Sequence, residues 1–483
     1  MRKTKIVCTV GPACSTKEML LKMIDAGMNV ARVNMSHGTH ESLIDVFATI
    51  REAIDESGKN VAIMIDTKGP EVRTTGCEAP IEYKTGDVVK IFGRPEMDTT
   101  HDMINLSYEN FAADVYEGCH ILFDDGALDM LVIGINGPAV IAQVQNDGVL
   151  GSHKSVNVPG VHIALPPLTD KDRKNIMLAI EQDIDFIAHS FVRSAADVRA
   201  VQAILDAYNS DIKIISKIEN QEGVDNIDEI IDASYGIMIA RGDLGIEVPI
   251  ERIPGIQRQI IRKCVQKKKP VIVATQMLHS MIQNPRPTRA EVTDIANAIY
   301  YRTDALMLSG ETASGKYPVE AVRTMATIAE QAEHDQFSQA NIELPLSENC
   351  DIREFMAHSA IEATERLGVK LIITDSSTGD TARNLAAFRG PNPVLAICYH
   401  DKLQRLLNLS YGVIPVYQKE HIGSEKLFLA AVRMLRQKGY VELDDKIAYL
   451  SGNVGAGGGT KFLEVNTVKE VFEQNYQFHL PKV

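Results

Sequence analysis

The stretch KIISKIEN, residues Lys213 to Asn220, changes abruptly from apolar to charged residues at its end, and GIMIARGDLG, residues Gly236 to Gly245, does the same. The apolar parts have the length and composition of buried strands. Side chains of a strand alternate between its two faces, so Lys217 and Glu219 point the same way, and Asp243 follows the second strand. Buried charges need partners. The two stretches therefore predict a site where a cationic side chain lies between two carboxylates.

Strand-like apolar runs of this kind recur along the chain, and amphipathic helical patterns such as Ser15–Ala26, Ala195–Tyr208 and Ile253–Lys267 separate most of them. Such alternation predicts an α/β fold with a parallel (β/α)8 barrel, the TIM barrel, in which functional side chains lie where strands end. The predicted strands are Lys5–Val10, Asn29–Ser36, Val61–Thr67, Ile184–Phe191, Lys213–Glu219, Gly236–Asp243, Val271–Met277 and Ala305–Ser309.

Residues 70–167 interrupt the alternation with short strand patterns and turn dipeptides such as Asp125-Gly126 and Asn136-Gly137. This texture predicts an inserted all-β domain, a small barrel that is placed to close over the site as a lid. A separate α/β domain of ordinary size follows the last barrel strand. The predicted domains are the first part of the barrel (1–69), the lid (70–167), the second part of the barrel (168–340) and a C-terminal α/β domain for regulation and oligomerisation (341–483).

Composition excludes several classes of protein. The chain is 45% apolar and 24% charged, as in globular proteins, and its net charge of -14 argues against binding to nucleic acid or to anionic membranes. The seven cysteines form no CxxC pair, which indicates reduced thiols. No apolar run approaches the length of a membrane span. We expect a cytoplasmic protein with neither a nucleic-acid nor a membrane partner.

Polar residues also lie at the ends of the second and third predicted strands. Arg32, Asn34 and Ser36 share one face of the second strand, which favours a ligand site, although a polar network at the barrel rim would give the same pattern. Asp66 and Thr67 end the third strand and offer hard oxygen atoms of the kind that cations prefer.

Arg73 follows shortly after the third strand and carries a fork of donors that suits phosphate. The alternative is a turn with a surface ion pair, which is common and weak.

Glu219 and Asp243 suit Mg²⁺ or Mn²⁺, which take their other ligands from water and substrate. Lys217 beside them would stabilise a phosphoryl group during transfer. Removing one such donor typically costs about 3 kcal/mol. The alternative is an ordinary buried salt bridge, which three converging charges make the weaker interpretation.

Two glycine-rich segments resemble nucleotide motifs but do not satisfy them. Gly310 to Lys316 nearly matches a P-loop, yet Tyr317 stands where the Mg²⁺-binding hydroxyl belongs. Gly452 to Gly459 misses the GxGxxG spacing of a dinucleotide site. We interpret the first as the loop after the eighth strand and expect no dinucleotide at the second.

Two further features allow more than one interpretation. The hydroxyl-rich segment Thr374–Gly379 joins a strand to a helix, where it suits a phosphate or simply caps the helix. The run Lys267–Lys269 is interpreted as a solvated surface segment.

Seven segments together resemble one family, pyruvate kinase, in its own motif order. They are TKIVCTVGPA, MNVARVNMSHG, IDTKGPEVR, ISKIENQEG, IARGDLGIE, ATQML and LSGETASGKYP, and they span the predicted barrel. The resemblance implies transfer of the phosphoryl group of phosphoenolpyruvate to ADP, which gives pyruvate and ATP in the last step of glycolysis. It also implies a homotetramer and Mg²⁺ (or Mn²⁺) and K⁺ as cofactors.

The resemblance also implies the roles of individual residues. Lys217 matches the transition-state stabiliser, with Arg32, Arg73 and Thr275 as further catalytic residues, and Thr275 acting through a water is one candidate for the proton donor to enolpyruvate. Mg²⁺ ligands are Glu219 and Asp243; K⁺ ligands are Asn34, Ser36, Asp66 and Thr67. Substrate contacts are Arg32, Lys217, Gly242, Asp243 and Thr275; nucleotide contacts are Asn34, His37, Arg73 and Lys154. A sugar-phosphate effector site comprises Thr374, Ser376, Ser377, Thr378 and Gly379.

Glu71 stands where K⁺-dependent members of that family carry Glu and K⁺-independent members carry Lys, so we predict K⁺ dependence. A metal-dependent lyase or aldolase acting on pyruvate or phosphoenolpyruvate would share the Lys217, Glu219 and Asp243 cluster, and is the main alternative. A catalytically inactive metabolite sensor is another, and the intact cluster argues against it.

Overall fold

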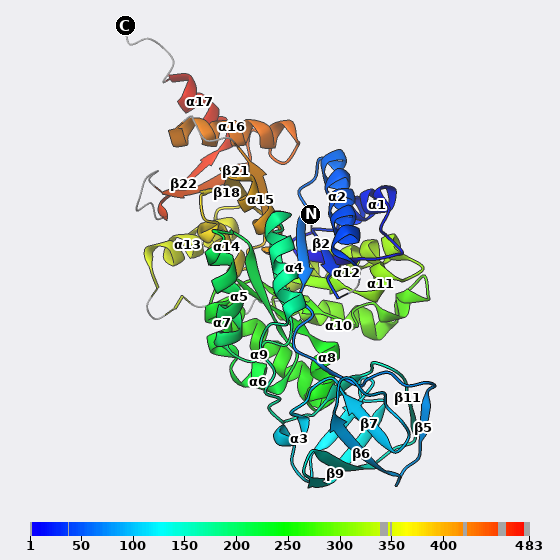
Figure 1. Ribbon diagram of the computed structural model, residues 1–483. Helices are drawn as coiled ribbons and strands as arrows, with labels where there is room; N and C mark the ends of the chain where they lie inside the picture. The colour runs from blue at the N-terminus through cyan, green and yellow to red at the C-terminus, as the bar shows by residue number, and fades with distance from the viewer. Residues whose placement is uncertain are drawn as a thin grey trace.

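A closed barrel of parallel strands forms the centre of the computed structural model, which describes residues 2–36, 38–338, 346–347, 350–418, 423–452 and 460–477 (Figure 1). The strands follow the order β1-β17-β16-β15-β14-β13-β3-β2 around the barrel. Their bounds are β1 Lys5–Val10, β2 Val30–Asn34, β3 Ala62–Asp66, β13 Phe186–His189, β14 Lys213–Ile218, β15 Gly236–Ala240, β16 Val271–Ala274 and β17 Ala305–Leu308. Each lies inside a predicted run, so the predicted barrel is confirmed.

Helices surround the barrel, and Thr side chains at their N-caps begin several of them. Thr39, Thr169 and Thr288 each form a capping box that satisfies backbone donors of the first helical turn. The helices in this part of the chain are α1 Lys17–Ala26, α2 His40–Ser57, α4 Asp170–Glu181, α5 Ala195–Ala207, α6 Gln221–Asp225, α7 Ile227–Ala233, α8 Arg241–Glu247, α9 Ile253–Gln266, α10 Arg289–Tyr300, α11 Gly310–Ala313 and α12 Pro318–Ser338, with short 3₁₀ turns at Ile250–Arg252 and His279–Ile282.

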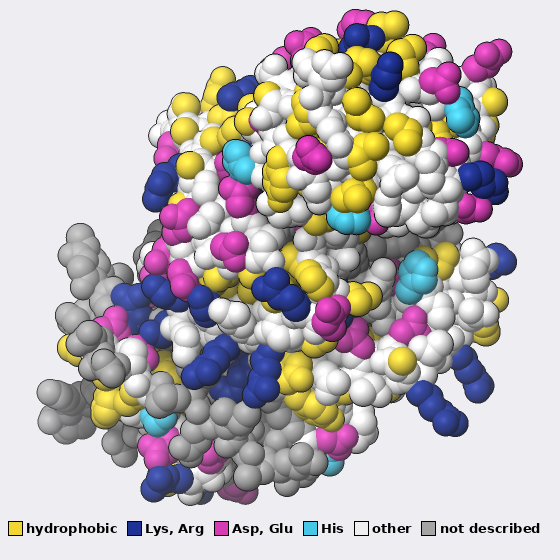
Figure 2. Space-filling view, turned by 90° about the horizontal axis from the view of Figure 1, so that it is seen from below, with side chains coloured by type: hydrophobic (Ala, Val, Ile, Leu, Met, Phe, Trp, Pro, Cys, Tyr) yellow, Lys and Arg dark blue, Asp and Glu magenta, His cyan; other side chains and the backbone are white. Residues whose placement is uncertain are grey.

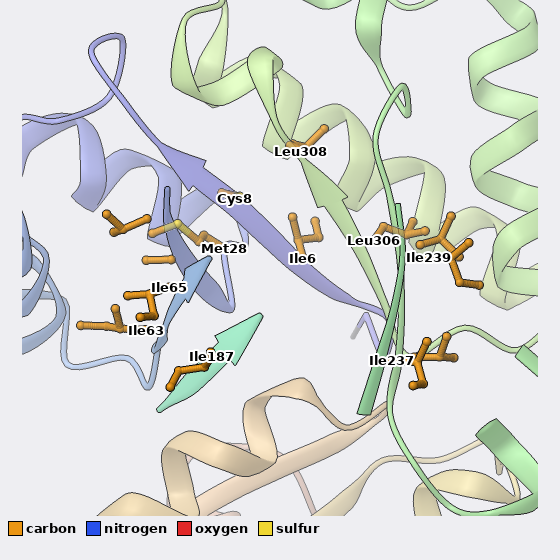
Figure 3. Close-up of a cluster of buried hydrophobic side chains, with 14 of the residues drawn as sticks. Ile6, Cys8, Met28, Ile63, Ile65, Ile187, Ile237, Ile239, Leu306 and Leu308 are labelled. Atoms are coloured by element: carbon orange, nitrogen blue, oxygen red, sulfur yellow. The ribbon is translucent and has the colours of Figure 1, made fainter. Parts of the chain in front are cut away.

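Alternation along the strands divides their apolar side chains between two cores. The outward-pointing set packs against the helices, and Figure 3 shows part of it: Ile6, Cys8, Met28, Ile63, Ile65, Ile187, Ile237, Ile239, Leu306 and Leu308. The intervening residues fill the barrel: Val7, Val30, Ala62, Met64, Phe186, Ala188, Ile215, Met238, Ile272, Ala274, Ala305 and Met307. Strands that are apolar on both faces are the reason why these runs read as continuously hydrophobic.

The insertion after β3 forms a second core of its own. A seven-stranded sheet follows the order β4-β12-β8-β9-β10-β6-β7, beside the two-stranded sheet β11-β5. A bridge between Thr74 and Leu106 joins its two edges. The elements are β4 Val72–Arg73, β5 Ile81–Tyr83, β6 Val88–Gly93, β7 Met103–Leu106, α3 Phe111–Asp114, β8 His120–Phe123, β9 Leu128–Asn136, β10 Ala139–Val144, β11 Gly148–Leu150 and β12 Ser155–Asn157.

The C-terminal part contains a five-stranded sheet in the order β20-β19-β18-β21-β22, in which only β22 runs antiparallel to its neighbour. Its elements are α13 Ile352–Arg366, β18 Val369–Ser376, α14 Asp380–Ala387, β19 Val394–Cys398, α15 Asp401–Leu406, a 3₁₀ turn at Leu407–Leu409, β20 Val413–Tyr417, α16 Gly423–Gln437, β21 Lys446–Gly452, β22 Thr460–Thr467 and α17 Val468–Gln477. In Figure 1 this sheet and the insertion lie at opposite ends of the barrel.

The three predicted domain limits stay a proposal that fits this layout. The limits at 69/70 and 167/168 fall between β3 and β4 and between β12 and α4. The limit at 340/341 lies outside the described residues, as do residues 453–459 of the second glycine-rich segment. The first glycine-rich segment follows β17, as predicted, but its first four residues, Gly310–Ala313, form the short helix α11 and are not a loop.

The prediction of a solvated lysine run is wrong for two of its three members. Lys268 pairs with Glu354 at 2.7 Å, and Lys269 donates to the carbonyl of Ser234 at 2.6 Å. Lys267 alone is exposed, beside Asp232. The partner of Lys268 is far away in the sequence, and the partner of Lys269 is a backbone carbonyl oxygen. The sequence around the lysine run therefore gives no sign of either contact.

The molecular surface mixes charges of both signs. On the face seen in Figure 2, Asp and Glu side chains are scattered, and several Lys and Arg side chains lie together in one area while others are spread over the rest of the face. The net negative charge of the chain thus leaves room for locally basic surfaces. None of the helices in the described ranges combines the length and apolarity that crossing a bilayer requires.

Asp185, just before β13, ties the C-terminal part to the bottom of the barrel. Its carboxylate accepts hydrogen bonds from the backbone N–H of Ile63 and from Arg405, both at 2.8 Å, and Lys402 lies 3.3 Å away. The side chain is 1% exposed. Asp183 pairs with the same Lys402 and Arg405, but its side chain is 68% exposed.

We therefore predict that Asp185→Asn lowers the free energy of unfolding by about 3 kcal/mol, because it removes a buried carboxylate that Arg405, Lys402 and the N–H of Ile63 all contact. Asp183→Asn is the matched control and should cost at most about 1 kcal/mol, as exposed pairs do. Denaturant midpoints and half-lives of thermal inactivation measure the two effects. Equal losses in both variants would contradict the assignment.

Candidate active site

A ring of polar side chains lies directly above the apolar filling of the barrel. Residues two positions apart in a strand point the same way. Beyond the interior residues Val7, Val30, Met64, Ala188 and Ile215 therefore come Thr9, Arg32, Asp66, Ser190 and Lys217. The strands that fill the barrel thus also position a set of polar groups at its carboxyl end.

Arg32 and Asp66 form the first half of this network. The Nε atom of Arg32 donates to Asp66 Oδ1 at 2.7 Å, its Nη2 contacts the other carboxylate oxygen, and its Nη1 donates to Thr9 Oγ1 at 2.8 Å. Both charged side chains are buried. Burial alone would raise the pKa of Asp66, but Arg32 and Lys217 outweigh it and hold that pKa below its usual range.

Lys217 forms the second half and lies among three oxygen acceptors. Its Nζ atom is 2.7 Å from Glu219 Oε1, 3.3 Å from Asp66 Oδ2 and 3.0 Å from Ser190 Oγ. Burial alone would lower the pKa of Lys217, yet the carboxylates of Glu219 and Asp66 raise it well above its ordinary value. The amine is therefore held as a cation within this network.

Glu219 points to the same side as Lys217, as the alternation predicts. Its Oε2 atom accepts a hydrogen bond from the backbone N–H of Phe191 at 2.7 Å. Burial raises the pKa of Glu219 to about 7. A cation brought close to this carboxylate would favour its ionised form.

Ser190 is a member of the network that the sequence analysis missed. Its hydroxyl accepts from Lys217 and donates to the carbonyl of Thr67 at 2.8 Å, and its N–H donates to Thr67 Oγ1 at 2.9 Å. It orients Lys217 and links it to the end of β3. The signal was present, since His189-Ser190 is a change to polar residues at the end of the fourth predicted strand.

Asp243 reaches the site from a helix, which corrects its assignment to a strand run. Strand β15 ends at Ala240, and α8 begins at Arg241, so Asp243 lies in the first helical turn. Asp243 still lies near the network, because its charge contributes to raising the pKa values of both Arg32 and Lys217.

Thr275 connects this helix to the next strand. Its Oγ1 atom accepts a hydrogen bond from the N–H of Gly242 at 2.7 Å. Thr275 and the following Gln276 both have positive φ values, 67° and 56°. A β-branched residue rarely adopts this conformation, and such strain tends to gather at functional sites.

A cleft of about 160 Å³ lies between the barrel rim and the insertion. Its polar lining includes Glu71, Arg73, Asp125, Asn157, Arg193, Asn220, Glu222, Asp243 and Glu247. Arg73 pairs with Glu71 at 2.8 Å and donates to the carbonyl of His153 at 2.8 Å. Arg73 therefore forms the surface ion pair that was the alternative to a ligand site, and the same side chain also lines the cleft. Asn157 donates to Glu247 at 2.8 Å and so joins the insertion to α8.

The proposed K⁺ ligands lie together at the ends of β2 and β3. Asn34 and Asp66 are direct neighbours in the strand register, and Thr67 follows. Asn34 Oδ1 accepts from the N–H of Ser36, whose carbonyl accepts from Lys171. These groups supply the oxygen donors that a hard cation prefers.

The predicted nucleotide contacts are less closely gathered. His37 lies outside the described residues. The Nζ atom of Lys154 is 2.9 Å from Asp124, and Lys154 does not line the cleft that Arg73 lines. The role of these residues toward a nucleotide stays a prediction.

The hydroxyl-rich segment before α14 forms local turn hydrogen bonds. Ser376 Oγ accepts from the N–H of Gly379 at 2.7 Å, and Thr378 Oγ1 donates to Asp380 at 2.8 Å. Thr374 is fully buried in β18, whereas Ser377 is exposed. The N-cap of α14 is Gly379, without a side-chain capping bond, so helix capping by the hydroxyl groups is not seen here, and an effector role for the segment stays a prediction.

In the described part of the chain, no cluster of three or more His, Cys, Asp and Glu side chains could hold a metal by itself. Glu219 and Asp243 supply two carboxylates, a set that fits Mg²⁺, which commonly binds through one or two carboxylates and completes its shell with water and substrate. Zn²⁺ of the structural kind would need a fuller protein shell.

Comparisons with known proteins agree over nearly the whole chain. Family models described as "Pyruvate kinase, barrel domain" and "Pyruvate kinase, alpha/beta domain" match residues 1–322 and 354–466. A pyruvate kinase of Bacillus licheniformis is 45% identical over 480 residues, which cover 98% of this chain and 81% of that protein. One from Borreliella burgdorferi is 44% identical, with 97% and 98% covered.

A solved structure shows the same arrangement. The crystal structure of a pyruvate kinase from Cryptosporidium parvum superposes with a TM-score of 0.89 at 39% sequence identity, and the match covers 97% of this chain and 96% of the other.

Gly69 allows a prediction on how tightly the site is packed. Its φ is +74°, and a Cβ atom there would lie 2.9 Å from both Ser190 Cβ and a ring carbon of Phe191. Gly58 has a similar φ of +62°, but a Cβ there would meet nothing within 4 Å.

Gly58→Ala should therefore cost only the backbone strain, about 1 kcal/mol, while Gly69→Ala should cost about 1–3 kcal/mol more because it displaces Ser190 and Phe191. Denaturant midpoints of the two variants measure the difference. If both lose the same stability, the ends of β3 and β13 are not packed against each other as described.

Proposed function

The chain belongs to the pyruvate kinase family, and we propose that it acts through a barrel-rim site that transfers the phosphoryl group of phosphoenolpyruvate to ADP, with Lys217 as the stabiliser of the group in transfer. The observation that carries this proposal is the position of the Lys217 amine, buried among Glu219, Asp66 and Ser190. Phosphoryl transfer depends mainly on positioning and on electrostatic stabilisation, and a preorganised buried cation provides both.

Arg32 and Lys217 are the two residues we assign to the substrate phosphate. Both are held by Asp66, so the distance between the two cations is fixed before any ligand arrives. Oxygen atoms of the phosphoryl group compete with the present acceptors for their N–H donors. Arg73, facing the cleft from β4, is placed to contact phosphate groups from the side of the insertion.

Glu219 and Asp243 are the residues we assign to Mg²⁺ or Mn²⁺. When bound, the divalent ion neutralises charge on the phosphate oxygens. The buried Glu219 carboxylate is held in place by the N–H of Phe191, and Asp243 by the first turn of α8. Asn34, Ser36, Asp66 and Thr67 are the ligands we assign to K⁺.

Gly242, Asp243 and Thr275 are assigned to the carboxylate of the substrate. The hydrogen bond between Gly242 and Thr275 fixes the start of α8 against the end of β16. The side chain of Thr275 thus lies beside the first turn of α8, whose backbone N–H groups have no partner within the helix. Such groups favour a bound anion. A water held by Thr275 is our candidate for the proton donor to enolpyruvate.

The remaining assignments rest on family membership. We propose that Asn34, His37, Arg73 and Lys154 contact the nucleotide, that the segment Thr374–Gly379 receives a sugar phosphate, and that the chain forms a homotetramer in the cytoplasm. A lyase or aldolase on the same barrel is not favoured, since the family models cover both the barrel and the C-terminal sheet.

A single assay tests the proposed reaction. Phosphoenolpyruvate, ADP, Mg²⁺ and K⁺ are mixed with the protein, and pyruvate and ATP are measured together; we expect equal amounts of both. Lys217→Ala should lower turnover by about 10²–10³-fold, because it removes one preorganised donor, while Mg²⁺ binding followed by calorimetry persists.

Lys213→Ala is the matched control, since Lys213 lies at the opposite end of the same strand β14. It should turn over at nearly the rate of the unaltered chain. Pyruvate without ATP would exclude the proposed reaction, and near-normal turnover of Lys217→Ala would remove Lys217 from it.

Glu71 provides a second test, on the monovalent cation. Its carboxylate lies 3.1 Å from Lys68 and 2.8 Å from Arg73, so it balances two cations beside the cleft. We expect the unaltered protein to need K⁺. Glu71→Lys, which places a fixed positive charge there, should raise activity in K⁺-free buffer.

Glu71→Gln removes the negative charge without adding a positive one and should remain K⁺-dependent. Initial rates with K⁺ and with a bulky quaternary ammonium ion at equal ionic strength give the comparison. Full activity of the unaltered protein without K⁺ would contradict the assignment.

A further inference from the structure

A second charged pocket lies at the opposite end of the barrel strands from the site described above. It opens where the segment before β16 meets α14 and Ser410 of the C-terminal part. We call it the junction pocket and define it by its polar lining: Lys268, Lys269, Asp304, Arg383, Arg389 and Ser410. The proposed reaction makes no use of any of these residues.

Donors outnumber available acceptors in the junction pocket. Asp304 contributes the one carboxylate of this lining, and both its oxygen atoms are engaged: one accepts from Arg389 at 2.8 Å and from the N–H of Val271, the other from the N–H of Tyr411. The other five polar residues carry ammonium, guanidinium or hydroxyl groups. Such a set is unsuited to a metal ion and suited to an anion.

Lys269 is the cation of this pocket without a carboxylate partner. Lys268 pairs with Glu354, Arg383 with Asp380, and Arg389 with Asp304. For Lys269, by contrast, the structure of the described residues shows only a hydrogen bond to the carbonyl of Ser234. Burial and, after it, the nearby charge of Arg383 lower the pKa of Lys269, and the charge of Asp232 offsets this only in part.

Two further groups of the lining have no partner. Ser410 Oγ and Arg389 Nε are buried and, within the described residues, make no hydrogen bond. Ser410 is 2% exposed and Arg389 5%. Buried polar groups are nearly always satisfied, and each one left unpaired costs about 1–3 kcal/mol. Two of them in one small pocket therefore indicate an occupant that accepts hydrogen bonds.

The size of the pocket restricts the occupant. The pocket volume is about 10 Å³, room for one species of about the size of a water molecule and too little for a polyatomic oxyanion, a nucleotide or a sugar. A water molecule would satisfy hydrogen bonds but would leave the charge of Lys269 uncompensated. A compact anion does both.

We propose that the junction pocket binds one monatomic anion, a halide, between Lys269, Arg389 and Ser410. Bound there, the anion joins residues of the barrel to residues of the C-terminal part and so stabilises their contact. Arg383 of the same pocket also links the two parts of the chain. It donates to the hydroxyl of Tyr235 at 3.4 Å and to the carbonyl of Thr378 at 3.3 Å. Tyr235 immediately precedes β15, whose other end leads into Asp243.

Anomalous diffraction tests the site directly. Crystals of the whole protein are soaked separately in sodium bromide and in sodium selenate, and difference maps are calculated at the bromine and selenium absorption edges. We expect a bromine peak in contact with Lys269 Nζ and Arg389 Nε and no selenium peak there, because selenate is too large for the pocket. Peaks confined to the barrel rim or to the segment Thr374–Gly379, or a water in the pocket, would overturn the proposal.

Thermal unfolding gives the same test in solution. The unfolding midpoint should rise with bromide at constant ionic strength, because an anion bound to the folded state stabilises it. Lys269→Met and Ser410→Ala should each weaken the midpoint-derived anion affinity by about 10-fold or more, as the loss of one charged or hydrogen-bonded contact does.

Lys267→Met is the matched control from the same lysine run, since Lys267 is exposed and paired with Asp232. It should respond to bromide as the unaltered protein does. Using two pocket variants keeps the test decisive if one of them folds poorly. An unchanged response in Ser410→Ala and Lys269→Met would exclude the junction pocket as the binding site.

Discussion

Four buried charges at the carboxyl end of the barrel set the conditions for the rest of the structure. Arg32, Asp66, Lys217 and Glu219 come from three strands and are linked through Asp66 and through the Lys217 amine. Charges removed from water are tolerated only when they are paired and hydrogen-bonded. The three strands must therefore meet in one register, and a shift of one residue in β3 would turn Asp66 away from both cations.

The same register explains how the barrel is filled and closed. Each strand gives its interior side chains to the apolar filling and its next interior position to the polar ring. At the opposite end, Leu406 and Leu409 from the C-terminal part complete the interior core. Asp185 and Asp304 then hold that part in place through Arg405 and Arg389. The C-terminal part is thus packed into the barrel core and is not a loosely tethered addition.

The sequence predicts the features that follow from the alternation of strand side chains between two faces, namely the barrel strands and the side chains that share a face. The barrel strands and the shared direction of Lys217 and Glu219 needed only the change from apolar to polar residues. Ser190 obeys the same rule and could have been found. Asp243 was assigned to a strand because the apolar run before it has no helical period, and a seven-residue helix offers too short a pattern to detect. Contacts such as Lys268 with Glu354 depend on segments that meet only in the folded chain, and no local pattern encodes them.

The two charged pockets differ in their balance of positive and negative side chains, and this difference determines which ligands each can bind. At the rim, two cations face two carboxylates, so an added anion alone would meet Asp66 and Glu219, and an added cation alone would meet Arg32 and Lys217. A neutral network of this kind is best suited to ligands that arrive with opposite charges, as a phosphate and a divalent ion do. At the junction pocket the balance is broken by Lys269, and the two groups that lack a partner among the described residues, Arg389 Nε and Ser410 Oγ, can both donate. A single anion satisfies that arrangement, whereas the rim requires a pair.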